Sequence, residues 1–512
     1  MAENITRESI LSKDLICSNQ KESQLEFQVL LPEITQGEAQ VLFTDGTAKI
    51  RALKTQADKL TIDGELETVT VYSGTDIKAA CAKASKNFSI DMEMPGLLPG
   101  HEVSASASLE KISCITDVSQ AKLNTVISVK ATACELSQVQ VITDINDIPL
   151  ETKRTSVSAR IKFGEGSSKA LVDSVAELPF GLTSKKILFD RSTAAPVSVS
   201  VIDGGVTISG IVTIDAYHLT PLLDKPIAKT HHVLPFDTAI DIDSARQGQS
   251  AKVTLSLSDT KLTLQTDDDG ASSFLFEGKL TSHAVIEDQT SISVIEDAYS
   301  TGISTVDLKM REINIKADSF LRTAQDQLRL NAILPKERTP IGALLACFAR
   351  PVYYDIDKTG NASITGSMDV SIVYLPEGST KIESFTQELP FEAVFDIRCP
   401  DCCMDELTVK DIDAVLIATD QVEARMTLAL KCEGDMTQSV LVPTDAVRRE
   451  NDLPEKSMIS VYFVQNGDTL WSIAKNCLTT IDNLKRFNPD CTHISPGDKL
   501  ILLKKGRGAL TN

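Results

Sequence analysis

Cysteine side chains gather at one place where their spacing could hold a metal ion. Cys399-Pro-Asp-Cys402-Cys403 has the C-x-x-C spacing of half a zinc site. A structural zinc site needs four ligands, no histidine accompanies the cluster, and Cys432 is the nearest further candidate. We therefore predict free thiols here, with part of a zinc site as the alternative. No metal ion and no other cofactor is assigned to the chain.

Three further segments have residue types that could do chemistry, but each lacks the required spacing. His231-His232 has no cysteine or carboxylate partner at a defined spacing, so we expect histidines on a strand surface. Gly164-Glu-Gly-Ser-Ser-Lys169 lacks the spacing of a phosphate loop, and Asp267-Asp-Asp-Gly270 lacks the alternating carboxylates and distant Glu of a calcium loop. Both segments are predicted to be turns. The common hydrolase, zinc-peptidase and dinucleotide-binding motifs are also missing from the sequence, so we predict that the protein is not an enzyme.

The most specific spacing in the chain lies near its C-terminal end, in Val461–Ala474. An alternating, strand-like segment runs into a Gly467-Asp468 turn and then into an apolar helix start. Asp468 or Thr469 can cap that helix, because a side-chain oxygen there accepts a free backbone N–H. Trp471, the only tryptophan of the protein, follows directly. A lone Trp in so small a segment is expected to be core.

Together with Asn488-Pro489 and Pro496–Ile501, this spacing resembles a LysM module over Ile459–Lys504. The resemblance implies a βααβ domain that binds a ligand and catalyses nothing. It places the binding site in two loops, formed by Gly467, Asp468, Thr469, Asn488, Pro489 and Asp490. The expected core consists of Trp471, Ile473, Leu484, Leu500 and Ile501.

The chain departs from the common LysM pattern after the first predicted helix. Lys475–Thr480 lacks the usual Tyr-Gly, and Leu502-Leu503 stands where Ile-Pro is common. We therefore expect no measurable affinity for chitin or peptidoglycan fragments. The apolar Leu478 is expected to serve a protein partner instead, as part of a small hot spot.

Three sequence marks recur in the same order before the LysM segment, which predicts a triplicated unit. The marks are a Leu-Pro pair, a strand ending in Gly, and a Phe that follows Leu-Pro in two of the three units. They are Leu31-Pro32, Leu178-Pro179 and Leu334-Pro335; Gly64, Gly210 and Gly366; and Phe88, Phe236 and Phe391.

Short alternating segments such as Val197–Val201 and Val253–Ser258 indicate strands separated by polar turns. The predicted fold is mainly β, with three tandem sandwich-like domains and a small βααβ domain. Asp318–Leu330 and Ser168–Val175 are predicted to be helical. The expected boundaries are an N-terminal segment 1–25, repeats at 26–150, 151–320 and 321–444, a charged linker 445–458, LysM at 459–504 and a tail 505–512.

Composition limits the classes of partner. The net charge of −20 and a pI near 4.8 argue against nucleic acid and anionic membrane surfaces. We find neither a secretory signal at the N-terminus nor an apolar run long enough for a transmembrane segment. Eleven scattered cysteines without an export signal indicate reduced thiols in a cytoplasm.

Acidic β-rich repeats followed by one LysM module resemble the SPOCS-domain spore-coat morphogenetic proteins. The resemblance implies a non-enzymatic adaptor in the mother-cell cytoplasm, at the forespore surface. Its LysM module would bind the ATPase scaffold protein of the coat, and other coat proteins are further candidate partners. The competing hypothesis is a cell-wall protein that binds peptidoglycan, with a hydrolase upstream.

Overall fold

A computed structural model gives the fold of most of the chain. It describes residues 5–34, 38–75, 77–117, 119–146, 148–179, 181–266, 272–398, 404–453, 455, 457–489, 491 and 493–504. The Cys399–Cys403 cluster, the Asp267–Gly270 segment and Asp490 lie outside these residues, so their predictions stay untested.

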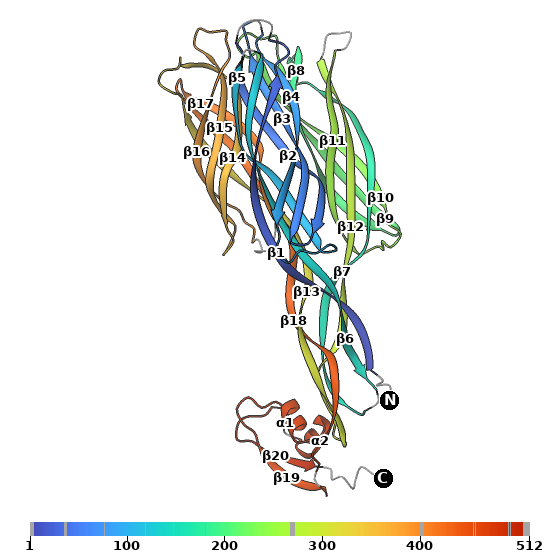
Figure 1. The fold of residues 1–512 in the computed structure, drawn as a ribbon. Coiled ribbons are helices and arrows are strands. Elements are labelled where there is room, and N and C mark those ends of the chain that lie inside the picture. The colour runs from blue at the N-terminus through green and yellow to red at the C-terminus, as the bar shows by residue number, and fades with distance from the viewer. Residues whose placement is uncertain are drawn as a thin grey trace.

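Three units of the same topology make up the chain before the LysM segment (Figure 1). Each unit packs a long sheet, in which its first and last strands pair antiparallel, against a short sheet of three strands. Unit 1 contains β1 (Ile5–Leu30), β2 (Gln40–Gln56), β3 (Lys59–Ser73), β4 (Ala80–Glu93), β5 (Glu102–Asp117) and β6 (Gln120–Ile145). Unit 2 contains β7 (Glu151–Glu177), β8 (Lys186–Ile202), β9 (Gly205–Leu219), β10 (Ile227–Asp241), β11 (Ser250–Thr266) and β12 (Ser272–Tyr299). Unit 3 contains β13 (Ser304–Ile333), β14 (Ile341–Asp357), β15 (Ser363–Pro376), β16 (Glu383–Val394), β17 (Met404–Ala418) and β18 (Gln421–Glu450). The predicted mainly β fold is confirmed.

Several local predictions are wrong because strand pairing overrides local propensity. Asp318–Leu330, expected to be helical, lies in β13 and pairs with β18. Ser168–Val175 and the expected turn Gly164–Lys169 both lie in β7, paired with β12. Two of the expected domain boundaries also differ from those seen in the structure. Unit 1 begins with β1 inside the expected N-terminal segment, and unit 3 begins with β13, ahead of residue 321.

The repeated Gly and Phe marks are cross-strand partners. Gly64 pairs with Phe88, Gly210 with Phe236, and Gly366 with Phe391. A Cβ atom at Gly210 would lie 2.4 Å from Phe236 Cζ. In units 1 and 2 the Phe ring therefore occupies the space of the missing side chain, which explains why the two marks recur together. The Leu-Pro marks follow the first long strand of each unit.

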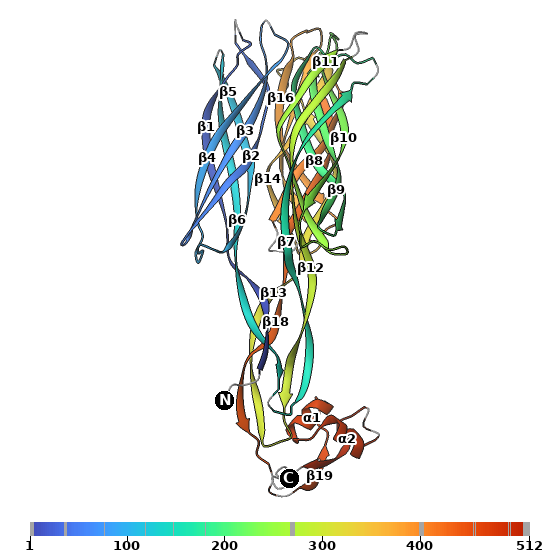
Figure 2. The same ribbon diagram turned by 90° about the vertical axis from the view of Figure 1, so that its right-hand side faces the viewer.

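The long antiparallel strand pairs β1/β6, β7/β12 and β13/β18, each formed by the first and last strands of a unit, run past the sandwiches and pack together as a stalk (Figure 2). Valine and isoleucine side chains from all three pairs fill its interior. Each pair has a register irregularity, between Leu15 and Cys17, Ile286 and Glu287, and Lys316 and Asp318. In units 1 and 2 these irregularities lie where the third strand of the long sheet begins. Bulges bend and twist strands, so they suit the change from sandwich to stalk.

Three phenylalanines from the short sheets meet between the units. The Phe43 and Phe348 rings stack with centroids 3.7 Å apart, and Phe189 lies 6.3 and 6.0 Å from them. The Arg191 guanidinium lies 5.5 Å from the Phe43 ring centroid and donates to Asp45 at 2.6 Å. One apolar cluster thus joins β2, β8 and β14, so the three units pack against one another and are not separate domains joined only by the chain.

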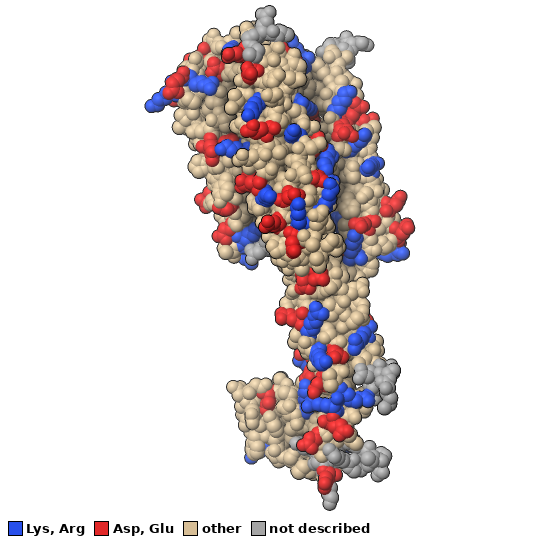
Figure 3. All heavy atoms as spheres, viewed as in Figure 1, with Lys and Arg blue, Asp and Glu red and all other residues tan. Residues whose placement is uncertain are grey.

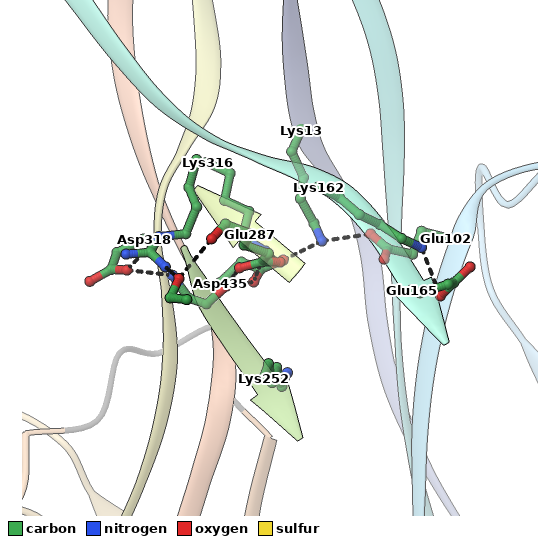
Figure 4. Close-up of polar contacts among 12 residues, drawn as sticks. Lys13, Glu102, Lys162, Glu165, Lys252, Glu287, Lys316, Asp318 and Asp435 are labelled. Atoms are coloured by element: carbon green, nitrogen blue, oxygen red, sulfur yellow. Dashed lines mark hydrogen bonds and ion pairs between the residues drawn. The ribbon is translucent and has the colours of Figure 1, made fainter. Parts of the chain in front are cut away.

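Charged side chains join the units at the start of the stalk (Figure 4). They line a cavity of about 830 Å³. Lys13 of unit 1 donates to Asp435 of unit 3 at 2.6 Å, and Lys316 of unit 3 donates to Glu287 of unit 2 at 2.5 Å. Burial alone would raise the pKa of Asp435, but Lys13 and Lys316 hold that pKa below its usual range. Since breaking a buried pair leaves an uncompensated charge, this network fixes how the units meet.

Of the two histidines predicted to lie on a strand surface, one is exposed and the other is buried. His231 is exposed and bonds to Asp215 Oδ1 at 2.7 Å. His232 is buried, so its predicted surface position is wrong. The fully buried His218 lies nearby, and both imidazole rings make T-shaped contacts with the Phe274 ring. Burial lowers the pKa of His218 to about 4.

We predict that replacing Gly210 by alanine destabilises unit 2 by roughly 1–3 kcal/mol, because the new methyl group overpacks against Phe236. The measurement is the urea midpoint of the full chain. Gly360→Ala is the matched control, since an added Cβ there meets nothing within 4 Å. Equal midpoints for the two variants would contradict the Gly–Phe explanation.

His218 should make stability depend on pH. An unfolded histidine titrates near pH 6.5, so between about pH 6.5 and 4 the unfolded chain binds more protons than the folded chain. Stability is then complete above about pH 6.5 and falls by about 3 kcal/mol as the pH drops to 4. His218→Tyr should remove most of this slope, because it removes the imidazole that titrates. The variant should still fold, because Tyr72 and Tyr374 occupy the corresponding buried positions of units 1 and 3.

The test compares melting temperatures between pH 7 and 4, with the exposed His283→Tyr as control. A slope that survives in His218→Tyr, or that disappears in the control, would assign the effect to other groups.

Candidate functional site

The C-terminal segment folds as two strands that enclose two helices, as the resemblance implied. Its elements are β19 (Met458–Phe463), α1 (Leu470–Asn476), α2 (Ile481–Phe487) and β20 (Lys499–Lys504). The two strands pair antiparallel, with Val461 opposite Ile501. Of the residues expected in the core, Ile473, Leu484 and Leu500 are buried. Ile501 is 47% exposed, so its predicted core position is wrong. Leu502 is buried instead, because alternate residues of a strand point to opposite faces.

The predicted binding loops are largely held by their own hydrogen bonds. Asp468 accepts from the Tyr462 hydroxyl and the Gln465 N–H, both at 2.8 Å. Thr469, not Asp468, caps α1, in a capping box with Ser472. These side chains therefore form the turn around Gly467, whose φ is +89°.

The second loop is likewise tied to the fold. Asn488 donates to the Ile501 carbonyl at 2.9 Å and accepts from the Ile501 N–H at 2.7 Å, so it joins the end of α2 to β20. Pro489 is exposed beside it. Leu478 is half-buried with φ of +54°, a region in which side chains are strained and glycine is favoured. The ligand role of all these residues remains a prediction.

Trp471 lies between the LysM module and the stalk. Its Nε1–H donates to Asp297 Oδ2 at 2.8 Å, and Lys475 Nζ lies 2.5 Å from Asp297 Oδ1. The Tyr299 ring meets the indole edge-on, with centroids 5.1 Å apart. Although partial burial raises it, the pKa of Asp297 stays below its usual range because of Lys475 and Trp471. Trp471 is only partly buried, so it is an interface residue as well as a core residue.

The connection between stalk and module is short and attached to the stalk. β18 continues through Asp445–Glu450, so the predicted linker begins too early. Asn451 is buried and donates from Nδ2 to the Ser300 and Gly302 carbonyls, at 2.8 and 2.7 Å. The Tyr299 hydroxyl also donates to the Thr479 carbonyl at 2.8 Å. Several hydrogen bonds therefore fasten the stalk to the connection and to the module.

An exposed apolar face on the LysM sheet was missed by the sequence analysis. Ile459, Val461 and Phe463 of β19 are 73, 55 and 57% exposed, and Ile501 beside Val461 is 47% exposed. These side chains share one face because they alternate with residues that point to the helices. The sequence signal for this face was the alternation that places apolar residues at positions 459, 461 and 463. We call Ile459, Val461, Phe463 and Ile501 the apolar LysM face.

Family comparisons agree with this architecture. The family model described as SipL, SPOCS domain matches residues 39–116 and 185–265, and the LysM domain model matches residues 462–502. The chain therefore carries two SPOCS domains and a LysM domain, which are binding modules, and this domain content suggests a link to sporulation and the spore coat. The SPOCS matches cover the short sheets and third strands of units 1 and 2, and unit 3 repeats their strand order.

No curated protein and no solved structure matches the chain. Neither helix among the described residues is long and apolar enough to cross a membrane. Within the same residues, no group of three or more potential ligands could hold a metal ion. Cys432 is disulfide-bonded, which contradicts the expectation of reduced thiols at that position.

We predict that Asp297→Ala loosens the LysM module from the stalk, because it removes the acceptor shared by Trp471 and Lys475. A hydrogen bond to a charged group contributes about 1.5–3 kcal/mol. The emission of Trp471, the only Trp in the chain, should shift to the red and become more sensitive to acrylamide. Far-UV circular dichroism should not change.

The matched control is Asp307→Ala, which removes an exposed carboxylate of β13 that pairs with Arg449. Unchanged Trp471 emission in Asp297→Ala would mean that this contact does not hold the module.

Proposed function

We propose that the protein is a non-enzymatic adaptor of the spore coat, located in the mother-cell cytoplasm at the forespore surface. In this proposal the LysM module binds the ATPase scaffold protein of the coat and thereby tethers it. Other coat proteins are proposed partners of the three units. The domain content supports coat association. The ATPase is proposed from the resemblance to the SPOCS-domain proteins, and the LysM surface supports a protein partner rather than a glycan.

The apolar LysM face is the observation that carries the proposal. Four large apolar side chains on one small sheet leave a water-exposed surface that a protein partner can bury. Burial of such side chains contributes roughly 25 cal/mol per Å² of apolar area. Glycan binding would instead use the loops at Gly467–Thr469 and Asn488–Pro489, whose polar side chains are largely engaged within the fold.

The shape supports a tethering role. β12 has 28 residues, so at roughly 3.3 Å per residue it spans about 90 Å. The LysM module lies at one end of the stalk and the sandwiches of the three units lie at the other (Figure 1). The sandwiches carry many charges of both signs on the face seen in Figure 3, whereas the visible part of the LysM module carries few. The two ends therefore present different surfaces to partners.

The test measures binding of the full chain to the purified ATPase scaffold protein. Val461→Asp should lower the affinity at least tenfold, because a partner would have to bury an unpaired carboxylate. Val233→Asp on β10 is the control, since Val233 is 50% exposed and Val461 is 55% exposed. Neither substitution removes a buried side chain, so both variants should keep the melting temperature.

Undiminished binding by Val461→Asp would remove the apolar LysM face from the interface. Titration of the full chain with N-acetylglucosamine oligomers addresses the alternative, a cell-wall protein. Saturable binding of the sugar with no binding of the ATPase would replace the adaptor proposal by the glycan proposal.

A further inference from the structure

One strand of unit 2 has an exposed edge without charges. β8 is the edge strand of the sheet β10-β9-β8, so one side of its backbone forms no strand ladder among the described residues, although β11 of the same unit lies close to it. Every residue from Ala195 to Ser200 is exposed. Val197 is 70% exposed and Ile202 is 47% exposed. From Ser192 to Ile202 the strand has no charged residue. Proteins usually protect such edges with charges, because an open edge pairs with other strands.

Units 1 and 3 provide an internal comparison. The corresponding part of β2 has Lys49, Arg51 and Lys54, which pair with acidic residues of β3. The corresponding part of β14 has Arg350, Asp355 and Asp357. In β8 these charges are replaced by serine, alanine and valine. The same topology is thus protected by charge in two units and left unprotected in the third.

The uncharged edge is self-complementary. Ser198-Val199-Ser200-Val201 alternates, so antiparallel pairing about Val199 sets serine opposite serine and valine opposite valine. Hydroxyls on neighbouring strands already bond in this sheet, where Thr193 Oγ1 lies 2.8 Å from Thr213 Oγ1. Pro196 lacks an N–H and Val197 sits at a register shift, so they end the pairing segment on one side.

We propose that β8 pairs antiparallel with β8 of a second copy of this chain, across a two-fold axis. Such an interface presents the same surface from both copies and needs no other partner. Because the segment is short, the dimer should be weak and depend on concentration. Pairing would present two LysM modules together, and a partner with several sites would be bound more tightly through avidity.

The experiment uses the full chain in sedimentation velocity over a range of concentrations. The wild-type chain should shift from monomer to dimer as its concentration rises. Ser198→Lys with Ser200→Lys should weaken association at least tenfold, because like charges then face each other across the axis. Ser198→Glu with Ser200→Glu should do the same. An equimolar mixture of the two variants should form a heterodimer.

The matched control is Thr207→Lys with Ser209→Lys. These exposed residues lie directly opposite Ser200 and Ser198 on β9, a central strand without a free edge. This variant should associate as the wild type does. A wild-type chain that stays monomeric at about 100 μM, or charge variants that do not associate when mixed, would overturn the proposal. A dimer insensitive to both Lys and Glu variants would overturn it as well.

Discussion

Continuous antiparallel pairing of three long strand pairs determines the shape of this protein. In each unit the first and last strands pair with each other from the sandwich into the stalk, so no loop interrupts the stalk. The short sheets, the apolar stalk interior and the LysM attachment all take their positions from these strand pairs. A register irregularity in each pair changes its direction at the start of the stalk without breaking it.

The three units have the same topology and share interfaces, but unit 2 differs from the others at several positions. The phenylalanine triangle and the ion pairs at the start of the stalk use residues from all three units, so each unit depends on the others. Unit 2 nevertheless differs in several respects. Its core has His218 where the other units have tyrosine, its edge strand β8 is uncharged from Ser192 to Ile202, and Asp297 and Tyr299 at the end of β12 hold the LysM module.

The LysM module has two faces with different roles in this structure. One side of α1 contacts the stalk through Trp471 and Lys475, which fixes the module at the end of the rod. The apolar LysM face lies on the sheet, away from the helices, and remains exposed. A module held in this way loses less orientational freedom on binding than a module on a flexible linker, so attachment to the stalk should favour partner binding.

Sequence alone determined the triplication and the β class, because these follow from recurrent spacing and alternation, and the resemblance to LysM modules implied the βααβ fold of the C-terminal segment. It placed Ile473, Leu484 and Leu500 in the core and marked Gly210 and Phe236 as recurrent, but it did not reveal that the two are partners. Local propensity misassigned Asp318–Leu330, since only pairing with β18 makes that segment a strand. The position of Trp471 against Tyr299 and the meeting of Phe43, Phe189 and Phe348 were decided by tertiary structure. They depend on contacts between residues far apart in the chain, which no local pattern encodes.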